Sequence, residues 1–167
     1  IGITGSIGMG KSTIASMLKF FGIPIHDSDL VVKELIETNS LVLKKIKKNW
    51  PEVIDIIHSK EIINKGKLSE IIFNNSKCKE NLEKIIHPLV HKKRKMFLKK
   101  HESKKKIVGM DVPLLYETGL NEICNYIFLA LTSEANQAKR VLKRKNMTEE
   151  KFISIKENQW SDEMKKE

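Results

Sequence analysis

The sequence predicts an α/β fold, in which helices flank a parallel β-sheet. A glycine-rich motif lies between a short apolar strand and a helix, further apolar strands end in carboxylates, and helical periodicity fills the segments between them. At 167 residues, 40% of them hydrophobic, the chain is long enough for one core and an inserted subdomain. Length therefore predicts a single domain.

The glycine-rich motif, at residues 5–12, fits the pattern GxxxxGK[S/T] and follows a strand predicted at residues 1–4. Glycines let the backbone curl until several N–H groups point inward, and a helix starting near Lys11 adds its positive end. We expect Lys11 to reach the β- and γ-phosphates and Ser12 to ligate Mg²⁺. The motif predicts a nucleoside triphosphate site, whereas a βα turn without a ligand is the alternative. The predicted nucleotide-binding residues are Gly5, Ser6, Ile7, Gly8, Met9, Gly10, Lys11, Ser12 and Thr13.

The net charge of +10 indicates either nucleic-acid binding or attraction of small polyanions such as nucleotides. The basic runs at residues 92–95, 99–100 and 104–106 lack interleaved aromatic residues, which favours a solvated basic face. The sequence shows neither an apolar run of membrane-spanning length nor a signal segment at its start, so we expect a cytoplasmic protein. Cys78 and Cys124 lack metal-ligand spacing and are expected to be free thiols.

Residues 22–27 predict a turn followed by a short apolar strand, which ends near two carboxylates, Asp27 and Asp29. Ligands of open α/β sheets bind outside the carboxyl ends of the strands. Both side chains project the same way if the extended conformation continues, whereas either could instead cap a helix over residues 30–37. A third strand, residues 106–111, ends in Asp111, a candidate for holding Mg²⁺ or its waters. A turn or capping role is the alternative for Asp111.

Residues 30–100 carry helical patterns, which predict an inserted helical lobe that grips a second substrate. The pattern breaks at His87 and Pro88, so we expect two helices there, with Pro88 at the first position of the second. From pattern alone, a structural role for His87 is favoured over a functional one.

A fourth, fully buried strand is predicted at residues 126–131, and residues 132–134 should cap the helix that carries Gln137, Arg140 and Arg144. Because the two arginines are four residues apart, we expect them on one face as a phosphate clamp. An exposed basic stripe is the alternative. Residues 148–150 should cap a final helix that has Gln159, Trp160 and Lys165 near its end.

Taken together, these segments resemble the dephospho-CoA kinase family over essentially the whole chain. The shared motifs lie at residues 5–13, 25–29, 86–90, 111–117 and 137–144. Members of this family phosphorylate the ribose 3′-hydroxyl of dephospho-CoA in the last step of coenzyme A synthesis. The resemblance implies a three-layer P-loop kinase fold, with a core at residues 1–29 and 106–135, a substrate lobe at about 30–100 and a lid at about 137–159.

The resemblance also implies roles for individual residues. Asp29 is implied to be the general base or the group that orients the 3′-hydroxyl. The implied catalytic residues are Asp29, Lys11 and Arg140. Arg140 and Arg144 correspond to lid arginines that close over ATP. The implied substrate-binding residues are Asp29, His87, Lys65 and Leu114, and the implied metal-binding residues are Ser12 and Asp111. Gln159 and Lys165 match a later family segment whose roles are less defined.

This sequence departs from the family pattern in three places. Ser28 replaces the usual Ala, and Lys65 replaces an Arg, which keeps the charge but loses the bidentate fork. The sequence also stops at Glu167, before the family's next strand and last helix, so we expect the fifth strand of the sheet and part of the base pocket to be missing.

The sequence thus predicts transfer of a phosphoryl group from ATP, with Mg²⁺, to dephospho-CoA. It predicts no nucleic-acid or membrane partner and leaves the oligomeric state open. The alternatives are another small-molecule P-loop kinase, such as a nucleoside monophosphate kinase, or a basic nucleotide-dependent protein that binds nucleic acid.

Overall fold

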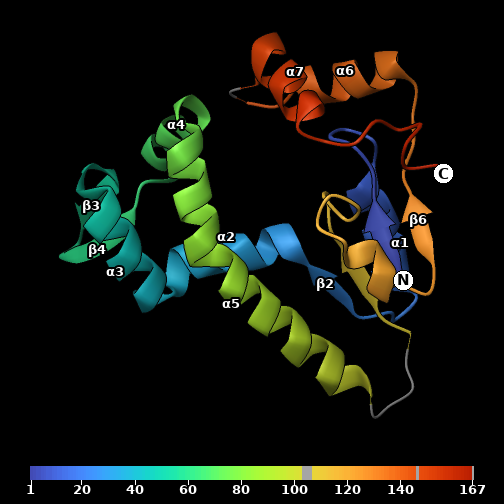
Figure 1. Cartoon of the computed structure of the whole chain (residues 1–167), viewed down its shortest axis with the longest axis horizontal. Helices are drawn as coiled ribbons and strands as arrows, with labels where there is room; N and C mark the ends of the chain where they lie inside the picture. The colour runs from blue at the N-terminus through green and yellow to red at the C-terminus, as the bar shows by residue number, and fades with distance from the viewer. Residues whose placement is uncertain (103–106, 146, 167) are drawn as a thin grey trace. The chain divides into compact units, whose positions relative to one another are not determined.

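The computed structural model describes residues 1–102, 107–145 and 147–166, and the chain divides into two compact units. The sheet unit comprises Ile1–Asp27 and His101–Glu167, and the helical unit comprises Ser28–Lys100 (Figure 1). None of the described helices has both the length and the apolar character needed to span a bilayer.

The sheet unit is built on a parallel sheet of β1 (Gly2–Thr4), β2 (Ile25–Asp27), β5 (Gly109–Asp111) and β6 (Ile127–Leu129) in the order β2-β5-β1-β6. The register aligns Ile3 with Asp111 and Phe128, and Asp27 with Asp111. Because the strands run in parallel, their carboxyl ends meet at one edge of the sheet. This edge is where ligands of such sheets bind, and the parallel sheet with its helices confirms the predicted α/β class.

The helices of the sheet unit are α1 (Lys11–Phe20), α6 (Glu134–Leu142) and α7 (Glu149–Glu157), with the 3₁₀ turn η2 (Leu120–Ile123). The α1 helix contacts β1, β2 and β5, and α6 contacts α7. The hydroxyls of Ser133 and Thr148 accept hydrogen bonds from N–H groups in the first turns of α6 and α7, which confirms both predicted caps. The buried apolar residues of this unit are Ile3, Met9, Ala15, Met110, Val112, Leu115, Ala130 and Val141.

The third and fourth predicted strands are shorter in the structure. The strand predicted at 106–111 is confined to Gly109–Asp111, and Lys106, like Lys104 and Lys105, lies outside the described residues. The prediction of a fully buried strand at 126–131 was wrong: β6 covers only Ile127–Leu129, and Phe128 is 43% exposed. Among the described strands, β6 pairs only with β1, so its other edge has no strand to cover it.

The last two helices end earlier than predicted. Arg144 follows the end of α6 at Leu142, and its N–H donates to the carbonyl of Val141 in a tight turn. The expectation that Arg140 and Arg144 share one helix face was therefore wrong. Likewise, α7 ends at Glu157, so Gln159, Trp160 and Lys165 lie beyond it.

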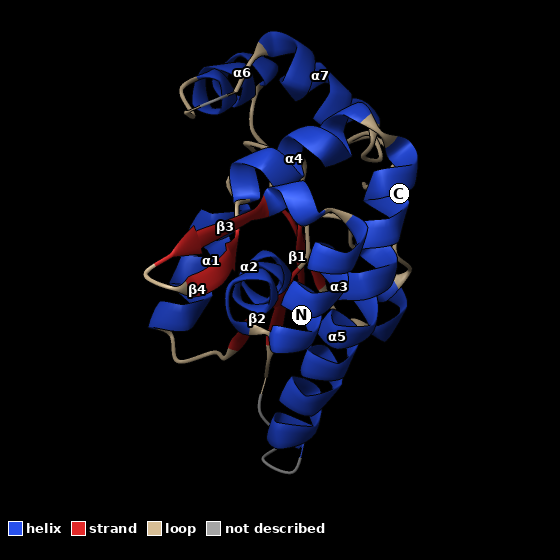
Figure 2. Cartoon of the chain, turned by 90° about the vertical axis from the view of Figure 1, so that its left-hand side faces the viewer, coloured by secondary structure: helices blue, strands red, loops and turns tan. Residues whose placement is uncertain are grey.

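The helical unit contains α2 (Ser28–Thr38), α3 (Ser40–Asn49), α4 (Lys65–Asn74) and most of α5 (Ser76–Glu102), with the 3₁₀ turn η1 (Pro51–Val53). Figure 2 shows that helices dominate this unit and that β3 and β4 form a separate red hairpin. The amphipathic helices bury their apolar faces against one another and against the hairpin. The resulting core consists of Leu35, Val42, Ile46, Trp50, Val53, Ile63, Leu68, Ile85, Ile86 and Val90.

The antiparallel hairpin of β3 (Ile54–Ile57) and β4 (Lys60–Ile63) was not predicted. Its two-residue turn places His58 and Ser59 at φ values of 47° and 61°, the left-handed conformation that tight hairpins require. Isoleucines on both sides of this turn could have indicated the two strands, because β-branched residues favour strands. The predicted helical lobe is therefore only partly helical.

The predicted break at His87 and Pro88 was also wrong, because α5 continues through both residues. A proline inside a helix removes one backbone hydrogen bond. His87 and Pro88 are both exposed, so the carbonyl that loses its partner lies on a side of the helix where water can reach it. The buried face of α5, with Ile85, Ile86 and Val90, holds the helix in place.

Candidate active site

The glycine-rich loop connects β1 to α1 at the carboxyl edge of the sheet, in the context that phosphate binding requires. Gly5 and Gly8 have φ values of 144° and 80°, and α1 begins directly after Gly10. Within the loop, the N–H of Met9 donates to the carbonyl of Ser6 over 3.2 Å. The Lys11 ammonium donates to the carbonyl of Gly5 over 2.9 Å, so the lysine side chain folds back along the loop.

Gly5→Ala should destabilise the protein far more than Gly22→Ala. Both glycines have positive φ, but a Cβ at Gly5 would lie 2.6 Å from the backbone oxygen of Ala130, whereas nothing lies within 4 Å of a Cβ at Gly22. We expect the free energy of unfolding to fall by about 3 kcal/mol for Gly5→Ala and by about 1 kcal/mol for Gly22→Ala. Urea denaturation of both variants measures the difference, and equal losses would contradict the close approach of the loop to β6.

Two oxygen donors of the sheet unit fit a magnesium ion. Ser12 is exposed in the first turn of α1, and Asp111 ends β5 beside the strand that leads into the loop. The described residues contain no group of three or more His, Cys, Asp or Glu that could hold a metal ion. One carboxylate and one hydroxyl suit Mg²⁺, which commonly binds through one or two protein groups plus substrate phosphates.

Of the two predicted lid arginines, the structure brings Arg140 to the glycine-rich loop. Its Nη1 atom lies 3.4 Å from the carbonyl oxygen of Gly8, at the edge of hydrogen-bonding distance, and the side chain is exposed. Arg144, beyond the end of α6, is also exposed. Arg140 is therefore carried by α6, whereas Arg144 is carried by the turn that follows it.

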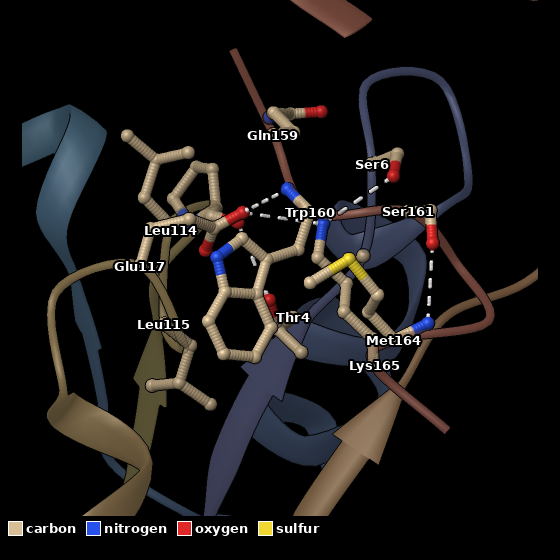
Figure 3. Close-up of polar contacts among 12 residues, drawn as sticks. Thr4, Ser6, Leu114, Leu115, Glu117, Gln159, Trp160, Ser161, Met164 and Lys165 are labelled. Atoms are coloured by element: carbon tan, nitrogen blue, oxygen red, sulfur yellow. Dashed lines mark hydrogen bonds and ion pairs between the residues drawn. The ribbon is translucent and has the colours of Figure 1, made fainter. Parts of the chain in front are cut away.

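The segment after α7 contacts the loop, which the sequence did not predict. Figure 3 shows that Glu117 accepts a hydrogen bond from the backbone N–H of Trp160 and lies near Lys165, whose ammonium reaches Ser6. The indole of Trp160 stacks on the ring of Tyr116, with centroids 5.7 Å apart. No local sequence signal indicates these contacts, since they join residues more than 40 positions apart.

A pocket of 570 Å³ adjoins the loop within the sheet unit. Its lining includes Ser6, Thr132, Lys156, Gln159 and Trp160. The Lys156 ammonium donates to Glu134 over 2.9 Å, and this hydrogen bond lowers the pKa of Glu134. The pocket thus combines an aromatic ring, hydroxyls and charges beside the phosphate-binding loop.

The remaining predicted site residues lie mainly in the helical unit. Asp29 lies in the first turn of α2, which begins at Ser28, so neither a continued strand nor a capping role for Asp29 is correct. His87 is exposed on α5. Lys65, the first residue of α4, forms an ion pair with Glu37, and their hydrogen bond lowers the pKa of Glu37. Leu114, by contrast, belongs to the sheet unit and is partly exposed in the turn after β5.

A glycine-rich loop between a strand and a helix, at the carboxyl edge of a parallel sheet, defines the class of P-loop nucleotide-binding α/β proteins. The family model described as dephospho-CoA kinase matches residues 1–167. The chain therefore belongs to the dephospho-CoA kinase family, as the sequence motifs indicated.

Individual proteins agree with this result. A dephospho-CoA kinase of Bartonella henselae is 38% identical over 167 residues, covering 99% of this chain and 83% of the relative. Among solved structures, a protein of Thermus thermophilus superposes with a TM-score of 0.77 at 25% identity, over 99% of this chain and 82% of that protein. A dephospho-CoA kinase from Campylobacter jejuni superposes with a TM-score of 0.64 at 25% identity, and the match covers 92% of this chain and 76% of that protein.

Membership in a kinase family makes the chain a transferase with ATP as a substrate. The family match does not favour the two alternatives from the sequence, a nucleoside monophosphate kinase or a nucleic-acid-binding protein.

Proposed function

We propose that this chain transfers the γ-phosphoryl group of ATP to the ribose 3′-hydroxyl of dephospho-CoA and so produces coenzyme A and ADP. The match of the whole chain to the dephospho-CoA kinase family carries this proposal. The glycine-rich loop at the sheet edge supports it, because phosphoryl transfer depends mostly on positioning and charge stabilisation.

On the donor side, residues 5–13 would surround the phosphates. They would offer backbone N–H groups such as those of Gly8 and Gly10, together with the positive end of α1. The Lys11 ammonium, folded along the loop in the structure, is the mobile charge that would follow the β- and γ-phosphates. Ser12 and Asp111 would hold Mg²⁺, which supplies neutralisation of phosphate charge when bound. The exposed hydroxyl and the strand-end carboxylate are suitable ligands for this ion.

On the acceptor side, we assign Asp29 the role of general base. A bond forms between the ribose 3′-oxygen and the γ-phosphorus, the bond from that phosphorus to the β,γ-bridging oxygen breaks, and the hydroxyl proton passes to the Asp29 carboxylate. His87, Lys65 and Leu114 are proposed contacts to dephospho-CoA. The exposed ion pair of Lys65 with Glu37 supports this role for Lys65, because such pairs contribute little and can be exchanged for a phosphate.

The lid is assigned to residues 137–159, with Arg140 and Arg144 closing over ATP to exclude water from the γ-phosphoryl group. The approach of Arg140 to the Gly8 carbonyl supports a position near the nucleotide. We also propose a cytoplasmic location, where Cys78 and Cys124, free thiols in the structure, would remain reduced.

A coupled assay for ADP formation tests the proposal, with dephospho-CoA, AMP, CMP and UMP offered as separate acceptors. We expect turnover with dephospho-CoA, and mass spectrometry of the product should show one added phosphoryl group on its ribose. Turnover confined to a nucleoside monophosphate would contradict the proposed acceptor. Hydrolysis of ATP without any phosphorylated acceptor would contradict kinase activity toward all four.

A further inference from the structure

Ile7, in the middle of the glycine-rich loop, has both of its backbone polar groups held by side chains from distant segments. Its N–H donates to Oε1 of Gln159 over 3.1 Å, and its carbonyl accepts from Nε2 of Gln137 over 2.8 Å. An N–H can only donate and a carbonyl can only accept, so these contacts fix which end of each amide faces the loop. One glutamine acts as acceptor and the other as donor for the same residue.

Gln137 is fully buried, and its helix packs directly on the loop. A Cβ at Gly8 would lie 2.5 Å from Cγ2 of Val141 and 3.2 Å from the carbonyl oxygen of Gln137. Only a glycine with φ of 80° lets the loop approach α6 this closely. In this arrangement, α6 packs against the loop from outside and holds Gln137 beside Ile7.

Ser6, the neighbour of Ile7, is held from the same segment as Gln159. Its hydroxyl donates to Asp162 over 2.9 Å and lies 3.4 Å from the Lys165 ammonium. Lys165 is 2% exposed, and its ammonium lies 3.6 Å from Glu117. Figure 3 draws this ion pair beside Ser6. The contact of the buried Lys165 with the partly buried Glu117 thus ties the segment after α7 to the turn after β5, and Gln159 approaches the loop from this segment.

These contacts leave a defined set of loop groups for phosphate. The N–H of Ile7 is directed at Gln159, whereas the N–H groups of Gly8 and Gly10 have no hydrogen-bond partner in the part of the chain that the structure describes. A glycine-rich loop samples many conformations unless its surroundings hold it. Fixing the loop before the ligand arrives reduces the ordering cost of binding.

We infer that Gln137 and Gln159 are positioning residues that hold the Ile7 peptide and keep the glycine-rich loop ready to receive the triphosphate of ATP. Neither side chain is assigned a contact with ATP. The inference rests on the proposed function only in that the loop binds ATP, and nucleotide binding is therefore measured separately from phosphoryl transfer.

The test uses the full chain with substitutions at Gln159, which is only partly buried and lies outside the helices. Gln159→Met keeps the length of the side chain and removes the acceptor, whereas Gln159→Glu keeps an acceptor oxygen. Asn158 is exposed, and its side-chain amide donates to the carbonyl of Ser154 in α7. Asn158→Leu is the control for removal of an amide, and Asn158→Asp is the control for added charge. Calorimetry with ATP at an ionic strength that screens surface charges gives the dissociation constants.

We expect Gln159→Met to weaken ATP binding about five- to tenfold relative to Asn158→Leu, the loss typical of one hydrogen bond. Gln159→Glu should bind ATP as Asn158→Asp does. In steady-state kinetics, the KM for ATP should rise for Gln159→Met while the KM for dephospho-CoA and the melting temperature stay near the wild-type values. Gln137→Met should likewise raise the KM for ATP more than the KM for dephospho-CoA.

Three results would overturn the inference. Unchanged ATP affinity in Gln159→Met would show that the Ile7 contact does not matter for binding, and equal losses in Gln159→Glu and Gln159→Met would show that the acceptor is not the relevant feature. A lowered melting temperature with unchanged KM for ATP would indicate a purely structural role. If Gln159→Met fails to fold, Gln159→Asn replaces it in the test. Its side chain is one methylene too short to reach Ile7, so its affinity for ATP also reports the loss of the acceptor. Failure of the wild-type chain to bind ATP would instead refute the proposed function.

Discussion

Lys11→Ala is expected to lower kcat/KM for ATP by about 10³-fold or more and to remove productive ATP binding. The ammonium of Lys11 already lies along the loop, 2.9 Å from the Gly5 carbonyl, and is the side-chain charge assigned to the β- and γ-phosphates. Truncation to alanine leaves the backbone of the loop in place but removes the charge that the transition state requires.

Lys19→Ala is the matched control, because Lys19 lies in the last turn of the same helix and is exposed. We expect this variant to retain kcat/KM within about twofold, since a solvated charge at the far end of α1 interacts weakly with the phosphates. Calorimetry with ATP and the coupled assay measure both variants. Wild-type activity in Lys11→Ala would refute the assignment of the loop to phosphate binding.

Asp29→Asn is expected to lower kcat by about 10²-fold or more while ATP affinity stays near normal. Asparagine preserves the shape of the side chain and one hydrogen-bonding oxygen, but it cannot accept the proton of the ribose hydroxyl. Because Asp29 is assigned to the acceptor substrate, the loss should appear in turnover with dephospho-CoA and not in the dissociation constant for ATP.

Asp27→Asn separates the two neighbouring carboxylates. Asp27 ends β2 in the sheet unit, whereas Asp29 lies in the first turn of α2 in the helical unit. We expect Asp27→Asn to retain far more activity than Asp29→Asn when both are compared by single-turnover kinetics. The reverse order would move the role of general base to Asp27.

The sequence predicted the glycine-rich loop well because its determinants are local. Residues 5–12 specify the turn themselves, and the strand before and the helix after them follow from short apolar patterns. The caps at Ser133 and Thr148 were predicted for the same reason, since each hydroxyl bonds an N–H three residues further on. These features depend on neighbours in the chain and hardly on tertiary structure.

Features that depend on distant residues were predicted poorly. Pro88 does not end a helix, because the packing of the buried face of α5 outweighs the loss of one hydrogen bond on its exposed side. From their spacing, Arg140 and Arg144 were expected on one face of a helix, but α6 ends at Leu142, before Arg144. The contact between Gln159 and Ile7 spans 152 positions, and only the folded chain brings them together.

The two tryptophans give each unit its own optical reporter. Trp50 is buried in the core of the helical unit, whereas Trp160 is 40% exposed and stacked on Tyr116 beside the glycine-rich loop. Their fluorescence should therefore differ in wavelength and in access to soluble quenchers. Replacing either indole with phenylalanine leaves an emission spectrum that follows one unit alone, so the folding of the two units can be monitored separately in the unlabelled protein.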